Sequence, residues 1–107
     1  PQSNQRLCRL LSGSSREPAQ ASAIVILLKG LKDRGCAPVL RRLLSHPAGP
    51  LVVDCAEALA AAGDSEALAP LRALVSGAHA DPRFAGAAGP ALLTRVERSL
   101  AAIPPAE

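Results

Sequence analysis

The 107-residue chain contains no tryptophan, tyrosine or methionine, and Phe84 is its single aromatic residue. Strand-rich sandwiches and barrels are built from aromatic and β-branched residues, so this scarcity argues against a β fold. Hydrophobic residues still make up 49% of the chain, which is too many for a disordered segment. Most of them are alanine and leucine, which are strong helix formers. The composition therefore predicts an all-α fold.

The chain also lacks a hydrophobic run of about 18 residues, which a membrane-spanning helix needs. Its longest apolar run, Ala23 to Leu28, has the length of a buried helix face. The N-terminus shows no secretory signal pattern. The cysteines, Cys8, Cys36 and Cys55, are odd in number and irregularly spaced, unlike a disulfide framework. We therefore expect buried thiols in a reducing compartment, the cytoplasm, with the nucleus as the alternative.

Acidic residues are scarce in the first half of the chain. Residues 1–46 carry eight Lys and Arg against Glu17 and Asp33, a net charge of +6. Residues 47–107 carry four Arg against seven acids, a net charge of −3, which leaves the chain at +3. Such a distribution could steer a partner or let copies stack head to tail. Ordinary solvated helix faces would produce it as well.

The main signal is an internal repeat. The pattern L-x-x-L-[L/V]-S occurs three times, starting at Leu7, Leu40 and Leu71, and a proline follows each time, at Pro18, Pro50 and Pro82. The leucine spacing places apolar side chains on one face of a helix. Proline is favoured in the first turn of a helix, so we expect each of these prolines to start the next one. Asp33 and Asp64 stand where an N-cap is needed. Each repeat of 31–33 residues is thus predicted to be a hairpin of a first (A) and a second (B) helix.

This phase divides a single domain, 1–107, into about six helices. In chain order we expect an unpaired B helix at 3–12, a repeat at 18–46 with helices at 18–32 and 35–45, a repeat at 50–76 with helices at 50–62 and 65–76, an irregular insertion at 77–89 with a turn at 82–85, and a terminal A helix at 90–103. The terminal helix should bury Leu92, Leu93, Val96, Leu100 and Ile103.

One segment carries a family resemblance. Residues 56–75, AEALAAAGDSEALAPLRALV, resemble the short bacterial, lyase-associated type of HEAT-like repeat, with armadillo repeats as close relatives. The resemblance implies a right-handed α-solenoid of antiparallel helical hairpins. It also implies a scaffold or protein-binding role, since only a few such members accompany enzymes.

The repeat phase leaves a helix without its hairpin partner at each end. A repeat cannot bury its apolar face alone, and solenoid ends normally carry polar caps. The chain also starts at Pro1 and has no methionine. We therefore expect a fragment of a longer solenoid, or an end that a partner covers.

No catalytic motif is present, and we expect no enzyme activity, metal or cofactor. His46 and His79 are placed at helix ends, where the C-terminal dipole favours histidine, and Asp81 is the one obvious further metal ligand nearby. Cys36, at a helix start, is a weak candidate for a reactive thiol. Asp54 and Glu57 lie one helix turn apart, and we expect them on a solvated face.

The candidate partner-binding residues are Arg9, Arg41, Arg42 and Arg72. All four fall on predicted B helices, which line the concave surface in the family that the chain resembles. They favour a non-catalytic interaction scaffold that binds an acidic or helical segment of another protein. The alternatives are self-association through the apolar ends, for which Ile26 is a candidate, and binding of nucleic-acid backbone by an arginine ladder. The absence of stacking aromatics weakens the last alternative, and a role as accessory subunit of an enzyme rests on family analogy alone.

Overall fold

A computed structural model describes residues 2–13, 17–31 and 35–103, and within these ranges the chain is helical and has no strand. The helices are α1 (Gln2–Gly13), α2 (Pro18–Leu31), α3 (Ala37–Leu43), α4 (Gly49–Ala62), α5 (Leu68–Ser76) and α6 (Gly89–Ala102). The 3-10 helix η1 (Ser65–Ala67) precedes α5. Two further 3-10 helices, η2 (Ala78–Ala80) and η3 (Pro82–Phe84), follow α5 and lie within the predicted insertion. The all-α class with six helices is confirmed.

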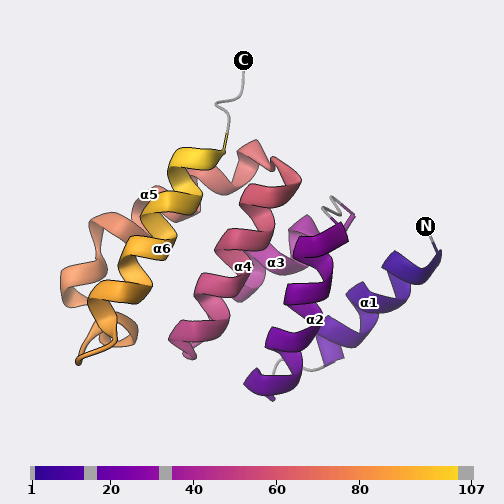
Figure 1. Cartoon of the computed structure of the whole chain (residues 1–107), viewed down its shortest axis with the longest axis horizontal. Helices are drawn as coiled ribbons and strands as arrows, with labels where there is room; N and C mark the ends of the chain where they lie inside the picture. The colour runs from indigo at the N-terminus through magenta and orange to yellow at the C-terminus, as the bar shows by residue number, and fades with distance from the viewer. Residues whose placement is uncertain (1, 14–16, 32–34, 104–107) are drawn as a thin grey trace.

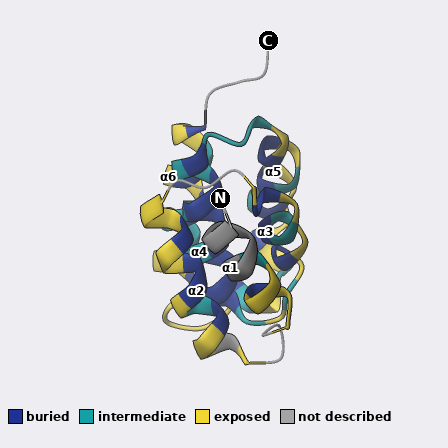
Figure 2. Cartoon of the chain, turned by 90° about the vertical axis from the view of Figure 1, so that its right-hand side faces the viewer, coloured by how far each residue is buried: buried dark blue, intermediate teal, exposed yellow. Residues whose placement is uncertain are grey.

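The helices form two layers (Figures 1 and 2). In one layer α4 lies between α2 and α6 and packs against both. In the other, α3 packs against α4 and α5 against α6, while α1 covers the seam of α2 and α3. The molecule measures 40 × 36 × 18 Å, and its smallest dimension fits two layers of helices about 10 Å wide. Each of α1, α3 and α5 thus presents a face on the same side.

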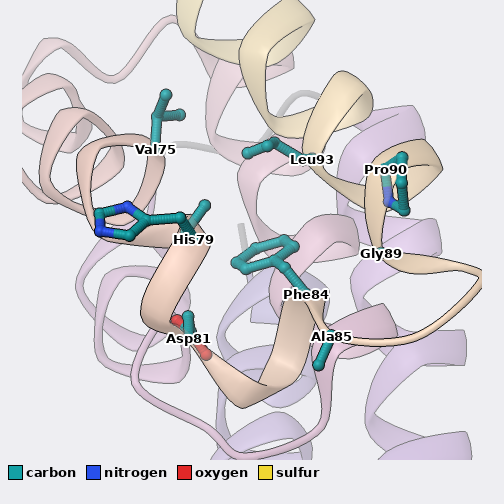
Figure 3. A pocket seen from close by; sticks show the side chains of 9 residues that line it. Val75, His79, Asp81, Phe84, Ala85, Gly89, Pro90 and Leu93 are labelled. Atoms are coloured by element: carbon teal, nitrogen blue, oxygen red, sulfur yellow. The ribbon is translucent and has the colours of Figure 1, made fainter.

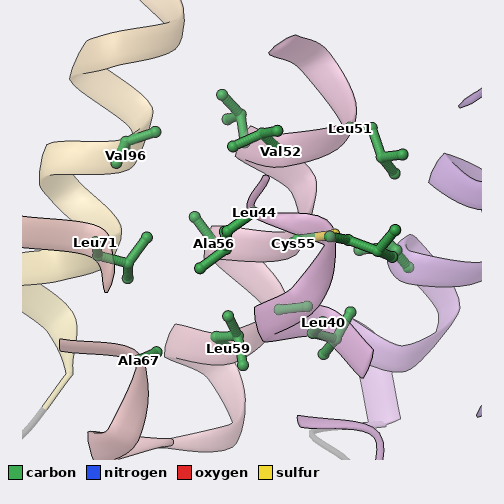
Figure 4. Packing of buried hydrophobic residues seen from close by; sticks show 14 of the residues in the cluster. Leu40, Leu44, Leu51, Val52, Cys55, Ala56, Leu59, Ala67, Leu71 and Val96 are labelled. Atoms are coloured by element: carbon green, nitrogen blue, oxygen red, sulfur yellow. The ribbon is translucent and has the colours of Figure 1, made fainter. Parts of the chain in front are cut away.

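The core centres on α4, whose residues are buried on three sides. Leu51, Val52, Cys55, Ala56 and Leu59 are all inaccessible to solvent (Figure 4). Small residues, alanine and cysteine, stand here among leucine and valine, so α2 and α6 can approach α4 closely. Val96 of α6 and Ile103, just after its end, are buried, while the predicted inward residues Leu92, Leu93 and Leu100 are partly buried against the same core.

Proline starts the helices of the α2 layer, with one exception to the predicted phase. Pro18 begins α2, Pro50 lies in the first turn of α4, and Pro90, not Pro82, lies in the first turn of α6. Pro82 instead begins the 3-10 helix η3. The insertion delays the start of the last helix. The sequence Ala-Gly-Pro at 48–50 and 88–90 shows that the start of α6 corresponds to the start of α4.

The predicted N-cap role of Asp64 is wrong. Asp64 precedes η1, but its side chain accepts no capping hydrogen bond. Its carboxylate pairs instead with Arg41 of α3, with Oδ2 3.0 Å from Nε. A charged partner across the hairpin outcompetes the backbone amides for this carboxylate. The companion prediction for Asp33 lies outside the described residues.

The expectation of three thiols is also wrong. Cys8 of α1 and Cys36, just before α3, form a disulfide, and their Cα atoms lie 5.4 Å apart, within the range that such bonds require. Only Cys55 is a free cysteine among the described residues. A reducing compartment was inferred from free thiols, and that inference no longer follows. Separately, no described helix has both the length and the hydropathy to cross a membrane.

Candidate functional site

Three of the four predicted arginines lie free at the surface of the α1, α3 and α5 layer. Arg9 on α1, Arg42 on α3 and Arg72 on α5 are exposed, and none of them forms an ion pair with another described residue. Arg41 differs. Its Nε lies 3.0 Å from Asp64 Oδ2 and its Nη1 lies 2.6 Å from Glu66 Oε2. Arg41 therefore ties α3 to the segment before α5, and its charge is already balanced within the chain.

Two shallow grooves run between the helices of this layer. A groove of about 440 Å³ between α3 and α5 is lined by Leu44, Pro70, Ala73 and Leu74, with polar side chains at its rim. A smaller one of about 170 Å³ lies between α1 and α3, lined by Ser12, Val39, Arg42 and Leu43. The smaller groove, with the free Arg42 beside apolar residues, suits an extended or helical segment that carries acidic side chains, and the larger groove adds a mostly apolar floor.

Arg83 holds the rim of the larger groove, a role that no sequence pattern indicated. Its Nη1 donates to the carbonyl oxygens of Leu44 at 2.6 Å and His46 at 3.1 Å, just after the end of α3. Its Nε and Nη2 donate to Asp81, with the shortest contact 2.6 Å from Nη2 to Oδ2. The arginine thus satisfies carbonyls that a helix end leaves without partners and fastens the 78–84 insertion to the end of α3.

The histidines serve local structure or lie exposed. His46 Nδ1 accepts a hydrogen bond from the Ala48 amide at 3.0 Å, which shapes the turn before α4. His79 is exposed in η2. It lines a mostly apolar pocket of about 350 Å³ together with Phe84, Leu93 and Asp81 (Figure 3). The described part of the chain contains no group of three or more metal-ligating side chains.

The free thiol and the carboxylate of the Figure 3 pocket are each held in one protonation state. Burial, followed by the charge of Asp54, raises the pKa of the Cys55 thiol to about 12, so that it stays protonated. Hydrogen bonds from the Arg83 side chain lower the pKa of Asp81. The pocket of Figure 3 therefore contains an ion-paired carboxylate beside a histidine, and not a proton acceptor of raised pKa. Cys36, the candidate reactive thiol, is consumed in the disulfide.

The acidic pair of α4 does not lie on a solvated face, contrary to expectation. Glu57 accepts bonds from Arg95 of α6, 2.7 Å from Nη2 and 3.0 Å from Nε, and lies 3.4 Å from Lys29 of α2. Asp54 lies 3.1 Å from the same Arg95 Nη2. The hydrogen bonds that Arg95 donates lower the pKa of Glu57, and the same bonds, accepted by Glu57, raise the pKa of Arg95. Because α4 lies between two helices, its polar ridge meets their basic residues and links the layer.

Acid is expected to weaken the fold through Glu57 and Asp81. Both carboxyls have a pKa that is lower in the folded state, so the unfolded chain binds more protons in acid. Their contribution is complete above the unfolded values of about 4 and is lost as the pH falls through the folded values. Urea unfolding from pH 7 to pH 2.5 should show stability falling below about pH 4.5. Glu57→Gln should be less stable at pH 7 and decline less steeply, and a decline as steep as that of the wild type would contradict the assignment.

Comparison of the chain with protein-family models, curated proteins and solved structures finds no match. The function must therefore be argued from the surface itself.

Proposed function

We propose that this chain is a non-catalytic protein-interaction scaffold with a HEAT- or armadillo-like solenoid arrangement. The observation that carries the proposal is the set of exposed arginines without ion pairs, Arg9, Arg42 and Arg72, on the helices that form two shallow grooves, the smaller of which Arg42 lines. Two layers of alternating helices, with α1, α3 and α5 on one side, support the solenoid interpretation. The resemblance of residues 56–75 to a HEAT-like repeat supports it from the sequence.

The distribution of ion pairs favours an acidic partner. Most described acids are neutralised within the chain, namely Asp54, Glu57, Asp64, Glu66 and Asp81. Free carboxylates near the grooves would repel an acidic segment, and these acids are instead bound to Arg41, Arg83 and Arg95. The arginines that stay free can form charge-assisted, bidentate hydrogen bonds with carboxylates. Charge gives such a surface selectivity and fast association, and the groove floors add apolar contact.

The non-catalytic part of the proposal rests on the state of the reactive groups. The Cys55 thiol is buried and protonated, Glu57 and Asp81 are ion-paired at lowered pKa, and Asp54 is ion-paired with Arg95. A general base needs a pKa near the working pH and access to a substrate.

A charge-reversal titration tests this function. The disulfide-intact chain is titrated with a fluorescent glutamate-rich peptide, and Arg42→Glu/Arg72→Glu should bind at least tenfold more weakly, a loss of about 1.4 kcal/mol. Arg98→Glu is the control for the single variant Arg42→Glu, which changes the net charge by the same amount, because Arg98 is also exposed but lies on α6 in the opposite layer. Binding should weaken as salt rises.

Two results would contradict the proposal. One is equal loss of affinity in Arg98→Glu, which would reduce the effect to net charge. The other is a single-stranded oligonucleotide that binds more tightly than the peptide and responds to the same double variant, which would assign the arginines to nucleic-acid backbone. Helical content measured by circular dichroism should be unchanged in each variant, since the substituted side chains are exposed.

A further inference from the structure

The edge of the α2 layer carries an apolar face that no described residue covers. Ile26, Leu27 and Leu31 of α2 are 59%, 58% and 56% exposed, and Leu10 of the neighbouring α1 is 49% exposed. These are the large exposed hydrophobic residues of the described chain. Ala23, one turn before Ile26 and Leu27, and Gly30, between Leu27 and Leu31, are also exposed, so that the spacing forms one continuous stripe on the helix. We call Leu10, Ile26, Leu27 and Leu31 the α2 edge.

The internal repeat shows what such a face receives. Core positions of α2 recur in α4 after 31 residues, and all are buried: Ala21 and Val52, Ile24 and Cys55, Val25 and Ala56, Leu28 and Leu59. By the same offset, Leu27 corresponds to Ala58 and Leu31 to Ala62, which are only 2% and 4% exposed in α4. Ala58 and Ala62 share a helix face with Leu51 and Cys55, which point toward α2. The equivalent face of α4 is therefore covered by a helix, and that of α2 is open.

The opposite edge of the layer is different. The residues that α6 exposes include Thr94, Glu97, Arg98 and Ala101, and no large hydrophobic residue of α6 is exposed. A head-to-tail stack of copies would press this polar surface onto the apolar α2 edge. A head-to-head pair would bring together two halves that each carry a net charge of +6. Both arrangements of a second copy are therefore disfavoured.

We propose that the α2 edge docks an amphipathic helix of another protein, whose apolar face is flanked by acidic residues. The shape follows from the helix that covers the equivalent face of α4. The charge follows from the basic surroundings: Arg9 is exposed next to Leu10 without an ion pair to a described residue, and residues 1–46, which include α1 and α2, carry a net charge of +6. Helices bind such faces through leucine-type anchors at i, i+3, i+4 and i+7. The apolar residues of the α2 edge line neither groove, and only Arg9 belongs to both proposed surfaces.

The test uses two synthetic helical probes. Both are 18-residue peptides with leucine and alanine on one face, on the order of five helical turns, and they differ only in carrying glutamate or lysine at the flanking positions. Fluorescence anisotropy should show that the glutamate probe binds at least tenfold more tightly than the lysine probe. Leu27→Asp should weaken the glutamate probe at least tenfold, and Ala101→Asp on the exposed side of α6 should have no effect.

Because the grooves also accept acidic helical segments, the probes are titrated into Arg42→Glu/Arg72→Glu as well. Adding Leu27→Asp to that variant should weaken the glutamate probe at least tenfold again, which separates this proposal from the proposed function. Leu27 is exposed, so its substitution should preserve helicity, and Ile26→Asp provides a second variant if it does not. Equal binding of the two probes, no binding of either, or indifference to both variants would overturn the proposal. So would a wild-type dimer in sedimentation that Leu27→Asp dissociates, because a second copy would then be the occupant.

Discussion

Gly89→Ala is expected to destabilise the fold by about 3 kcal/mol or more, at the upper end of what overpacking costs. Gly89 is buried at the start of α6, where the 3-10 helix η3 passes directly over its backbone. A Cβ at this position would overlap the carbonyl oxygen of Phe84 and lie 2.5 Å from its carbonyl carbon. The obstacle is backbone and not a flexible side chain, and Arg83 fastens that segment to the end of α3. The clash cannot be relieved without detaching the insertion.

Gly30→Ala is the matched control for this prediction. Gly30 lies within α2, is exposed, and has no atom within 4 Å of where a Cβ would stand. Alanine is favoured over glycine inside a helix by up to about 1 kcal/mol, so this variant should be at least as stable as the wild type. Urea unfolding followed by circular dichroism compares them. A Gly89→Ala variant as stable as Gly30→Ala would show that η3 does not pack on the start of α6.

Replacing both bridged cysteines, Cys8→Ala/Cys36→Ala, is expected to cost about 3.5 kcal/mol. The bond closes a loop with a sequence separation of 28, and the chain-entropy estimate for a loop of that length is about 3.5 kcal/mol. A loss of this size is a large part of the free energy of unfolding of a small domain. The bond also attaches α1 to the start of α3, so its loss should free α1 first.

Reductant provides the control for the cysteine prediction. Dithiothreitol should lower the unfolding midpoint of the wild-type chain toward that of Cys8→Ala/Cys36→Ala and leave the double variant unchanged. Cys55 is buried with a pKa raised to about 12, so it should not react with thiol reagents until the chain unfolds. A wild-type midpoint that reductant does not change would show that the bond contributes nothing.

The helices could be predicted from the sequence because the signals that define them are local. Apolar spacing and prolines locate every α-helix, and the observed bounds differ from the expected ones by a few residues at most. The last helix was expected at 90–103, close to its observed bounds, and only the helix start expected at Pro82 is wrong, because the proline period continues through an insertion that the helices do not follow. The Ala-Gly-Pro sequence at 48–50 and 88–90 was the signal that could have corrected it.

The contacts between helices could not be predicted, because they depend on which faces meet. Arg41 and Arg42 are neighbours in sequence, yet the side chain of Arg41 contacts Asp64 while that of Arg42 is exposed to solvent. The position of Asp54 and Glu57 on α4 alone predicts a solvent-exposed face. In the folded chain, α6 places Arg95 beside both carboxylates. The Cys8–Cys36 bond depends likewise on α1 packing against α3.

Amide chemical-shift mapping tests the central claim most directly, since it locates binding without altering the surface. The ¹⁵N-labelled, disulfide-intact chain is titrated with the glutamate-rich peptide. The shifted amides should cluster on α1, α3 and α5, around Arg9, Arg42 and Arg72 and along the two grooves. Shifts confined to α4 and α6, or no shifts at all, would contradict the claim that this helix layer is a protein-binding surface.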